Sequence, residues 1–210
     1  PSFEKYLSIV KTESKFESSV ENISPQISNS VTLSTMHGCP PQEIESIAKY
    51  MIEEKCFHTY VKLNPTLLGF ETVNGILYEL GYKYIRMDKE SFQHDLQFTD
   101  AIPMIQRLQN IAKQNGKEFG IKLSNTLGIK NTKNALPGDD MYMSGRSLFP
   151  LTVAIANKIS KTLNGHINIS FSGGANINNI KQILETGIYP VTLVTDLLKP
   201  GGYGRLQQMA

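Results

Sequence analysis

Short apolar runs alternate with segments of helical periodicity along most of this chain. Six runs of four to six residues, rich in β-branched and aromatic side chains, predict strands, and a helical segment follows each of the first five. The predicted strands cover residues 31–36, 59–63, 82–87, 119–124, 167–171 and 191–194. Strands that alternate with helices in this way are typical of parallel βα units.

Apolar stripes and capping residues delimit the predicted helices. The first begins at Pro40-Pro41, the second ends before Gly81, and Asp100 is expected to cap the third. The five helices that follow strands cover residues 41–52, 70–80, 100–116, 151–163 and 180–185. A further helix is predicted over residues 3–11, within a lead-in or linker of residues 1–30 that precedes the barrel part, residues 31–210.

Six βα units fit either a doubly wound sheet or most of a (β/α)8 barrel. Strands of a doubly wound sheet are covered on both faces and should be almost continuously apolar, but polar residues recur here with a period of two. The residues that share a face are Thr32 with Ser34, Lys62 with Asn64, Arg86 with Asp88, and Lys122 with Ser124. This pattern favours an α/β fold that is a partial TIM barrel with a polar interior.

The last two predicted strands end in candidate phosphate loops. Ser172, Gly173 and Gly174 follow one strand, and Thr195 follows the next. Successive glycines let backbone N–H groups converge on an anion, and the loops after the last two strands of a β/α barrel often hold a phosphate. A glycine pair by itself more often marks a plain turn.

Lysines and amides near two other strand ends are candidates for binding an electron-rich ligand such as a flavin. Lys62 and Asn64 lie at the end of the strand predicted over residues 59–63, and Lys122, Asn125 and Thr126 lie at the end of the strand predicted over residues 119–124. A lysine beside a flavin stabilises the negative charge that develops on reduction, and amides can bind the ring carbonyls. A structural alternative is a buried lysine paired with a carboxylate such as that of Asp88.

His37 and Cys39 follow the first strand and are candidate proton donors. A helix N-terminus lowers a thiol pKa, and histidine titrates near neutrality. One histidine and one cysteine are only half a metal site, so no metal is predicted. The long segment after Asn125 includes Ser144 and Gly145, which with the following arginine could bind an anion or form a lid.

Composition restricts the function classes. The 210 residues carry a formal charge of +2 and no run of like charges, which argues against nucleic acid as a partner. No stretch is apolar enough to span a bilayer and no signal peptide is evident, so a cytoplasmic location is expected. The two cysteines are too few for this segment alone to hold an iron–sulfur cluster by thiolates. The start at Pro1 indicates a segment of a longer protein.

Four segments resemble the YgfK family, whose members are regarded as selenate reductase subunits. They are residues 31–41, 61–69, 141–150 and 198–203, and the resemblance extends over about residues 25–208. It implies a barrel similar to those of dihydropyrimidine and dihydroorotate dehydrogenases, with this chain supplying strands three to eight. It also implies a multidomain oxidoreductase that carries FAD and iron–sulfur clusters elsewhere and takes electrons from NAD(P)H to a small substrate.

The same resemblance assigns FMN to this segment. Its phosphate would lie at Ser172, Gly173, Gly174 and Thr195, and its ring at Lys62 or Lys122. Asn125 and Thr126 resemble the Asn-Thr pair that ends the sixth strand in dihydropyrimidine dehydrogenase, and Ser144 and Gly145 resemble its Ser-Gly before the next helix. Cys39 follows a different strand from the proton donor of the FMN barrels. The remaining domains and molybdenum-enzyme subunits are the partners implied, and the segment is not expected to be active alone.

Asp196 departs from the family pattern, because a carboxylate beside a phosphate repels it unless it points away. This residue favours an alternative function, a barrel without flavin that serves as a scaffold for partner subunits. A barrel enzyme that acts on a phosphorylated metabolite without flavin is a third possibility. The residues do not distinguish selenate from an organic substrate.

Overall fold

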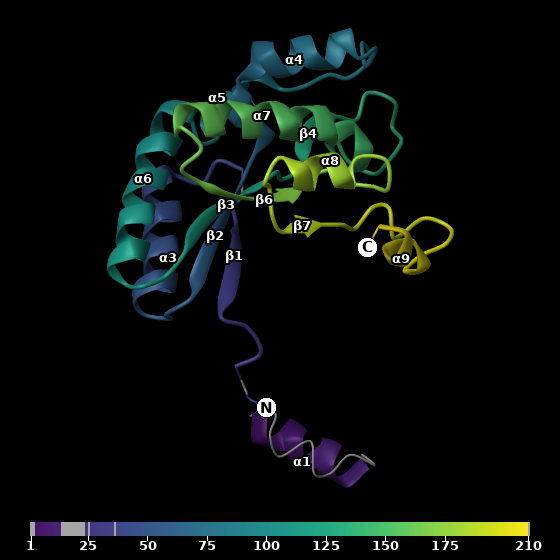
Figure 1. Ribbon diagram of the computed structural model, residues 1–210. Coiled ribbons are helices and arrows are strands. Elements are labelled where there is room, and N and C mark those ends of the chain that lie inside the picture. The colour runs from purple at the N-terminus through teal and green to yellow at the C-terminus, as the bar shows by residue number, and fades with distance from the viewer. Residues whose placement is uncertain (1–2, 14–23, 25, 36, 210) are drawn as a thin grey trace.

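A five-stranded parallel sheet forms the centre of the protein (Figure 1). The computed structural model describes residues 3–13, 24, 26–35 and 37–209. The sheet has the order β1-β2-β3-β6-β7, with strands β1 (Ser30–Ser34), β2 (His58–Leu63), β3 (Phe119–Leu123), β6 (Asn168–Ser172) and β7 (Val191–Thr192). The sheet curls, and its edge strands β1 and β7 do not pair, so the fold is a partial barrel.

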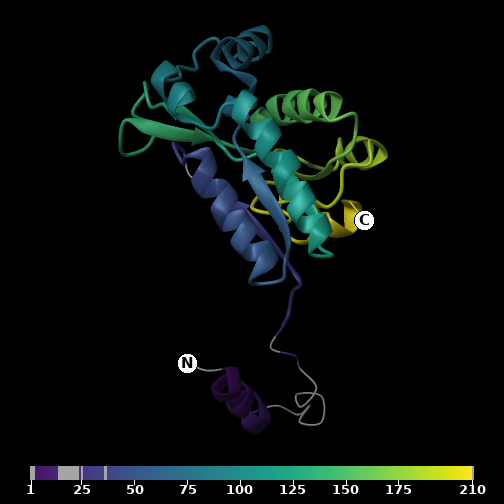
Figure 2. The ribbon, with the colours of Figure 1, turned by 90° about the vertical axis from the view of Figure 1, so that its left-hand side faces the viewer.

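Helices cover one face of this sheet. Figure 2 shows α3 and α6 side by side in front of the strands. The α-helices are α1 (Phe3–Glu13), α3 (Pro41–Glu53), α4 (Phe70–Glu79), α5 (Lys89–His94), α6 (Phe98–Gln114), α7 (Phe149–Thr162), α8 (Ile180–Glu185) and α9 (Gly204–Met209). Two 3-10 helices, η1 (Pro65–Leu68) and η2 (Gly145–Leu148), precede α4 and α7. In Figure 1, α1 lies apart from the sheet.

The alternation of side chains along the strands separates an apolar face from a polar one. In β2, Thr59, Val61 and Leu63 are buried while the residues between them are half-buried. The core consists of this apolar face and of the helix stripes packed on it, including Ile52, Leu108 and Ile155. The opposite face is the inner side of the partial barrel.

Polar side chains form a row across that inner face. Ser34 pairs in register with Lys62, Lys62 with Lys122, and Lys122 with Ser170. Because residues in register project from the same face of neighbouring strands, the polar interior expected from the sequence is confirmed for these strands.

The strand predicted over residues 82–87 is wrong. β2 pairs directly with β3, so the sheet has no place between them for another strand. The segment instead turns, with the Ile85 N–H donating to the Tyr82 carbonyl, and runs along the surface to α5. The shared strand face expected for Arg86 and Asp88 is therefore also wrong, and five parallel strands are present rather than six.

Several elements were not predicted. β4 (Leu127–Lys130) and β5 (Asp140–Met143) form an antiparallel hairpin within the long segment that follows Asn125. Asn131 closes its turn by donating from Nδ2 to the carbonyls of Leu136 and Gly138. The N-cap of α6 is Gln97 rather than Asp100, which lies in the first turn. Five strands cannot supply the six strands numbered three to eight. That they are the later strands of a complete barrel stays a prediction, as does the linker role of residues 1–30.

Candidate functional site

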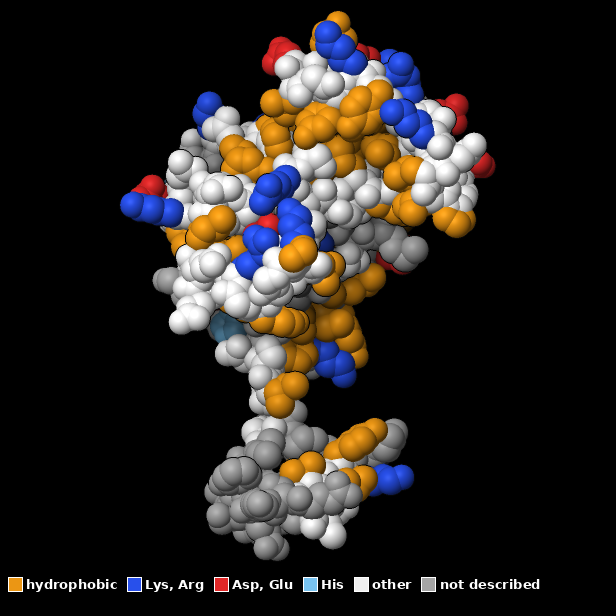
Figure 3. All heavy atoms as spheres, turned by 90° about the vertical axis from the view of Figure 1, so that its right-hand side faces the viewer, with side chains coloured by type: hydrophobic (Ala, Val, Ile, Leu, Met, Phe, Trp, Pro, Cys, Tyr) orange, Lys and Arg blue, Asp and Glu red, His pale blue; other side chains and the backbone are white. Residues whose placement is uncertain are grey.

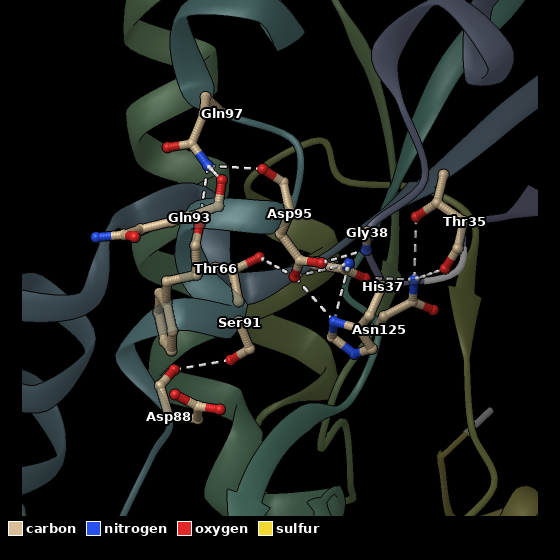
Figure 4. A network of polar contacts seen from close by, with 12 residues as sticks. Thr35, His37, Gly38, Thr66, Asp88, Ser91, Gln93, Asp95, Gln97 and Asn125 are labelled. Atoms are coloured by element: carbon tan, nitrogen blue, oxygen red, sulfur yellow. Dashed lines mark hydrogen bonds and ion pairs between the residues drawn. The ribbon is translucent and has the colours of Figure 1, made fainter.

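A polar network lies at the carboxyl ends of β1, β2 and β3, and Asp95 is its centre (Figure 4). The Asp95 side chain is 1% exposed and accepts four hydrogen bonds. Oδ1 accepts from the Gly38 N–H at 2.8 Å, and Oδ2 from Thr66 Oγ1 at 2.8 Å and Asn64 Nδ2 at 3.2 Å. The fourth partner is His37, whose Nδ1 lies 2.8 Å from Oδ2.

These donors keep Asp95 ionised. Burial alone would raise the pKa of a carboxyl group, but the hydrogen bonds from His37, Thr66 and the Gly38 amide outweigh it and lower the pKa of Asp95. A buried carboxylate with four donors is a fixed negative charge. Its charge therefore shifts the pKa of neighbouring groups while its own protonation state stays the same.

His37 is the group on which that charge acts most directly. The hydrogen bond and charge of Asp95 raise the pKa of His37 against the opposing effect of burial. Every polar contact found for the imidazole in the described part of the chain uses Nδ1. The ring also stacks on Tyr142 of β5, with centroids 6.2 Å apart. This arrangement fixes the ring and leaves Nε2 free to act on a ligand.

Asn64 connects this network to the barrel interior. Its Nδ2 donates to Asp95, and its Oδ1 accepts from Asn125 Nδ2 at 2.7 Å. Asn125 also donates to the Thr35 carbonyl at 3.2 Å, and Thr35 Oγ1 donates to the Lys62 carbonyl. The structure thus brings Asn64 and Asn125 together but uses both ends of the Asn64 amide within the protein. Thr126 is half-buried beside them.

Cys39 lies two residues before α3 without the expected activation. Burial, together with the nearby charge of Glu43, raises the pKa of its thiol. The lowered pKa expected from the helix N-terminus is therefore not found, because burial and, to a smaller extent, Glu43 in the first turn of α3 disfavour the thiolate. Cys39 is therefore protonated at neutral pH. The role of Cys39 as a proton donor stays a prediction.

Lys62 and Lys122 lie opposite each other on β2 and β3. Burial lowers the pKa of both, and the charge of Lys62 lowers that of Lys122 further. Lys122 Nζ donates to Thr192 Oγ1 on β7. Within the residues that the structure describes, neither lysine forms an ion pair, and Asp88 pairs with Lys130 instead. The alternative of a lysine paired with Asp88 is therefore wrong.

The candidate phosphate loops converge. A Cβ atom on Gly174, whose φ is +78°, would collide with the Gly145 carbonyl oxygen, and one on Gly145 would lie 2.9 Å from Thr195. A Cβ on Gly173 would collide with Thr152 of α7. These glycines therefore permit close packing of the loops that follow β5, β6 and β7. In the described residues, the N–H groups of Gly173, Gly174 and Thr195 donate no hydrogen bond to the protein. Ser144 and Ser172 flank the loops.

Three cations surround Asp196 beside these loops. Arg146 and Lys199 lie 3.5 and 3.4 Å from Oδ1, and Arg205 lies 3.6 Å from Oδ2. The carboxylate is 3% exposed, and its Oδ2 has no hydrogen-bond partner. Figure 3 shows Lys and Arg side chains gathered around an acidic side chain on this side of the molecule.

This cluster can bind an anion. The three distances exceed the roughly 2.7–3.2 Å of well-formed N–H···O bonds, so the cations retain donors for another partner. Three positive charges face one negative charge, so the surroundings of Asp196 carry an excess of positive charge despite its carboxylate.

The described residues contain no group of three or more His, Cys, Asp or Glu side chains arranged to hold a metal ion. None of the described helices is both long and apolar enough to cross a membrane.

Comparison with known proteins identifies the family. Residues 3–210 match the model for "Oxidoreductase YgfK, N-terminal TIM-barrel domain". The chain belongs to the YgfK family. It is 57% identical over 176 residues to the proteins named "Putative oxidoreductase YgfK" in Escherichia coli K12 and in E. coli O157:H7. The match covers 84% of this chain and 17% of each relative, so the chain spans about a sixth of their length.

Membership of this oxidoreductase family confirms the resemblance and the TIM-barrel class. Asp95, Lys199 and Arg205 were not identified from the sequence. Asp95 follows a six-residue helix that the pattern did not predict. The two cations are separated in sequence by Pro200, Gly201 and Gly202, a turn signal that brings Arg205 back toward Asp196.

Proposed function

We propose that this chain is the FMN-binding segment of a multidomain oxidoreductase that passes electrons from NAD(P)H to a small substrate. The observation that carries the proposal is the convergence of the Gly145, Gly174 and Thr195 loops beside the cations around Asp196. Family membership supports an oxidoreductase. FAD and iron–sulfur clusters belong, in this proposal, to the remaining domains of the longer protein.

The residues present fit a flavin phosphate. The unengaged N–H groups of Gly173, Gly174 and Thr195 supply backbone donors, and Arg146 and Arg205 supply guanidinium donors suited to phosphate oxygens. A phosphate dianion would neutralise the two excess positive charges of the cluster.

The inner face fits the flavin ring. Lys62 and Lys122 place two ammonium groups in one row, close to Asn125 and Ser34 at the strand ends. Bound flavin supplies two-electron chemistry here, and an ammonium group beside it stabilises the negative charge of the reduced form. The half-buried positions of both lysines strengthen that electrostatic interaction.

The test is the flavin content of the full-length protein. We expect one FMN per chain, released by denaturation and separated from FAD by chromatography. Arg146→Gln combined with Arg205→Gln should weaken FMN binding by about 10²- to 10⁴-fold, because the variant loses two charge-assisted hydrogen bonds of about 1.5–3 kcal/mol each. Arg107→Gln is the matched control, since Arg107 pairs with Glu45 on the helical layer.

A full-length protein that holds FAD and clusters but no FMN would refute this function. FMN retained equally by the double variant and by the control would refute the phosphate assignment alone.

A further inference from the structure

The surface between α4 and α5 carries a segment with the composition of a strand but no strand partner. Residues 82–87 turn and run along the surface to α5, with their apolar members packed on the core. The segment lies beside the β4–β5 hairpin, because the Lys130 N–H donates to the Arg86 carbonyl at 2.8 Å. Figure 1 shows α4, α5 and β4 at one end of the molecule. The remaining side chains of this segment therefore project from a surface that several elements build together.

Exposed tyrosines and lysines contact one another on this surface. Tyr78, at the end of α4, and Tyr84 are 57% and 58% exposed. Lys83 Nζ lies 4.6 Å from the centroid of the Tyr78 ring. Lys133 Nζ, from the turn of the hairpin, lies 5.0 Å from the centroid of the Tyr84 ring. These contacts define a tyrosine–cation patch that consists of Tyr78, Leu80, Lys83, Tyr84, Arg86 and Lys133.

The positive charge of the patch is not balanced. In the part of the chain that the structure describes, no carboxylate lies within ion-pair distance of Lys83, Arg86 or Lys133. The neighbouring lysines are paired, Lys89 with Glu71 and Lys130 with Asp140. The patch therefore offers three unpaired cations, which an acidic surface would complement.

Its side chains are already partly ordered. Arg86 Nη1 donates to the carbonyls of Lys83 and Ile85 at 2.8 and 3.1 Å, which fixes the guanidinium on its own turn and leaves its other nitrogens for a carboxylate. Contact with the two tyrosine rings restricts Lys83 and Lys133 in the same way. Binding therefore costs less side-chain entropy here than at freely moving surface lysines.

This chemistry fits a protein better than a nucleic acid. Tyrosine and arginine are enriched among the residues that contribute most to protein–protein binding. Nucleic-acid sites need a larger cluster of basic residues than three, and the whole chain carries a formal charge of only +2. The chain spans 17% of the length of its relatives, which leaves ample polypeptide to supply the partner. A partner in the same polypeptide acts at a high effective concentration, so a small patch suffices.

We propose that the tyrosine–cation patch docks an acidic surface from the remainder of a longer polypeptide that contains this segment, as its relatives do. Asp or Glu side chains of that surface pair with Lys83, Arg86 and Lys133, and an apolar or aromatic side chain packs on Tyr84 and Leu80. The docked part lies on the side of the sheet to which the hairpin after β3 belongs. This inference requires no bound flavin and does not depend on the proposed function.

Contact is tested by zero-length cross-linking of the full-length protein with a water-soluble carbodiimide, which joins a lysine amine to a carboxylate that touches it. Mass spectrometry should find Lys83 and Lys133 linked to Asp or Glu residues outside residues 1–210. About 0.5 M sodium chloride should reduce the yield, since salt screens exposed charges. Lys113 is the control, because it is exposed, has no ion pair among the described residues and lies in the last turn of α6. It should form no such link.

The energetic contribution of the patch is tested by hydrogen exchange on the full-length protein. In the triple variant Lys83→Gln, Arg86→Gln and Lys133→Gln, peptides over residues 78–86 should exchange about 3- to 100-fold faster, since each of three exposed ion pairs contributes a factor of about 1.4 to 5. Residues 119–123 of β3 should be unaffected. The matched control replaces three lysines at the amino ends of β2 and β3 by glutamine: Lys55, Lys113 and Lys117.

Each other outcome overturns the proposal. Equal cross-linking of Lys113, or links confined to residues 1–210, would show that no acidic surface docks at the patch. Links between isotopically labelled and unlabelled chains would assign the surface to a second copy. Binding of fluorescently labelled single-stranded DNA that is lost in the triple variant but kept in its control would assign the patch to nucleic acid. A protein without flavin would refute the proposed function and leave these measurements unchanged.

Discussion

Replacement of Gly174 by alanine isolates the contact that joins two candidate phosphate loops. Two costs are expected. The positive φ of +78° costs an alanine about 1–2 kcal/mol. In addition, the new Cβ collides with the Gly145 carbonyl oxygen and approaches the Arg146 Cα at 3.0 Å, and relief of such overpacking costs about 1–3 kcal/mol.

Gly165→Ala is a matched control for the first cost. Gly165 has a φ of +76° in the loop before β6, and a Cβ there meets nothing within 4 Å. The two variants therefore share the conformational cost, and only Gly174→Ala carries the collision. The difference of about 1–3 kcal/mol in local opening free energy corresponds to roughly 5- to 150-fold.

Hydrogen exchange measured by mass spectrometry on the full-length protein reports this difference locally. In Gly174→Ala, peptides that contain residues 144–148 and 172–176 should both exchange faster. The rate increase of these peptides in Gly174→Ala should be about 5- to 150-fold larger than the rate increase of the peptide around Gly165 in Gly165→Ala. Equal acceleration in the two variants, or acceleration confined to residues 172–176, would show that the loops do not depend on this contact.

Three further predictions concern the polar side chains. Asp95→Asn removes the hydrogen bond and the charge that raise the pKa of His37, so the pKa of the imidazole, followed by NMR titration of the histidine ring protons, should move to a lower value; an unchanged pKa would contradict this account of the network. Because burial and the charge of Glu43 raise the pKa of the Cys39 thiol, iodoacetamide should alkylate Cys39 slowly at pH 7, and Glu43→Gln should speed the reaction; an alkylation rate that does not respond to Glu43→Gln would contradict the electrostatic contribution of this carboxylate. Lys62→Met should raise the pKa of Lys122 by removing a neighbouring positive charge, and slower, pH-shifted reductive methylation of Lys122 measured by mass spectrometry would reveal it.

The strands that formed as predicted are those whose sequence alternates strongly between apolar and polar residues. In β2 and β3, the lysine between buried β-branched and leucine side chains indicated both the strand and its polar face. Register followed, because a slip of one residue would place Lys62 in the apolar core. Residues 82–87 also mix apolar and polar side chains, but Tyr82, Ile85 and Met87 pack on the core from a surface turn. Local pattern does not reveal that β2 already pairs with β3.

The site was only partly predictable for a related reason. His37, Asn64 and Asn125 follow strands, and parallel strands bring their carboxyl ends to one edge, so their proximity could be inferred. Asp95 lies 58 residues from His37 and follows a helix too short to show periodicity. Only tertiary structure reveals that it fixes the imidazole.

The charges of Lys62 and Lys122 bear most directly on the kind of ligand that the inner face could bind. Like charges directly opposite on neighbouring strands destabilise a sheet, and half-burial of both ammonium groups adds a desolvation cost, which the lowered pKa of each reflects. Among the described residues no carboxylate compensates them within ion-pair distance. A protein that needed this row only for folding would be more stable with one lysine replaced by an apolar or hydroxyl side chain. The pair is therefore better explained by a ligand that accumulates negative charge on this face, as a flavin does when it is reduced, than by any contribution to the barrel itself.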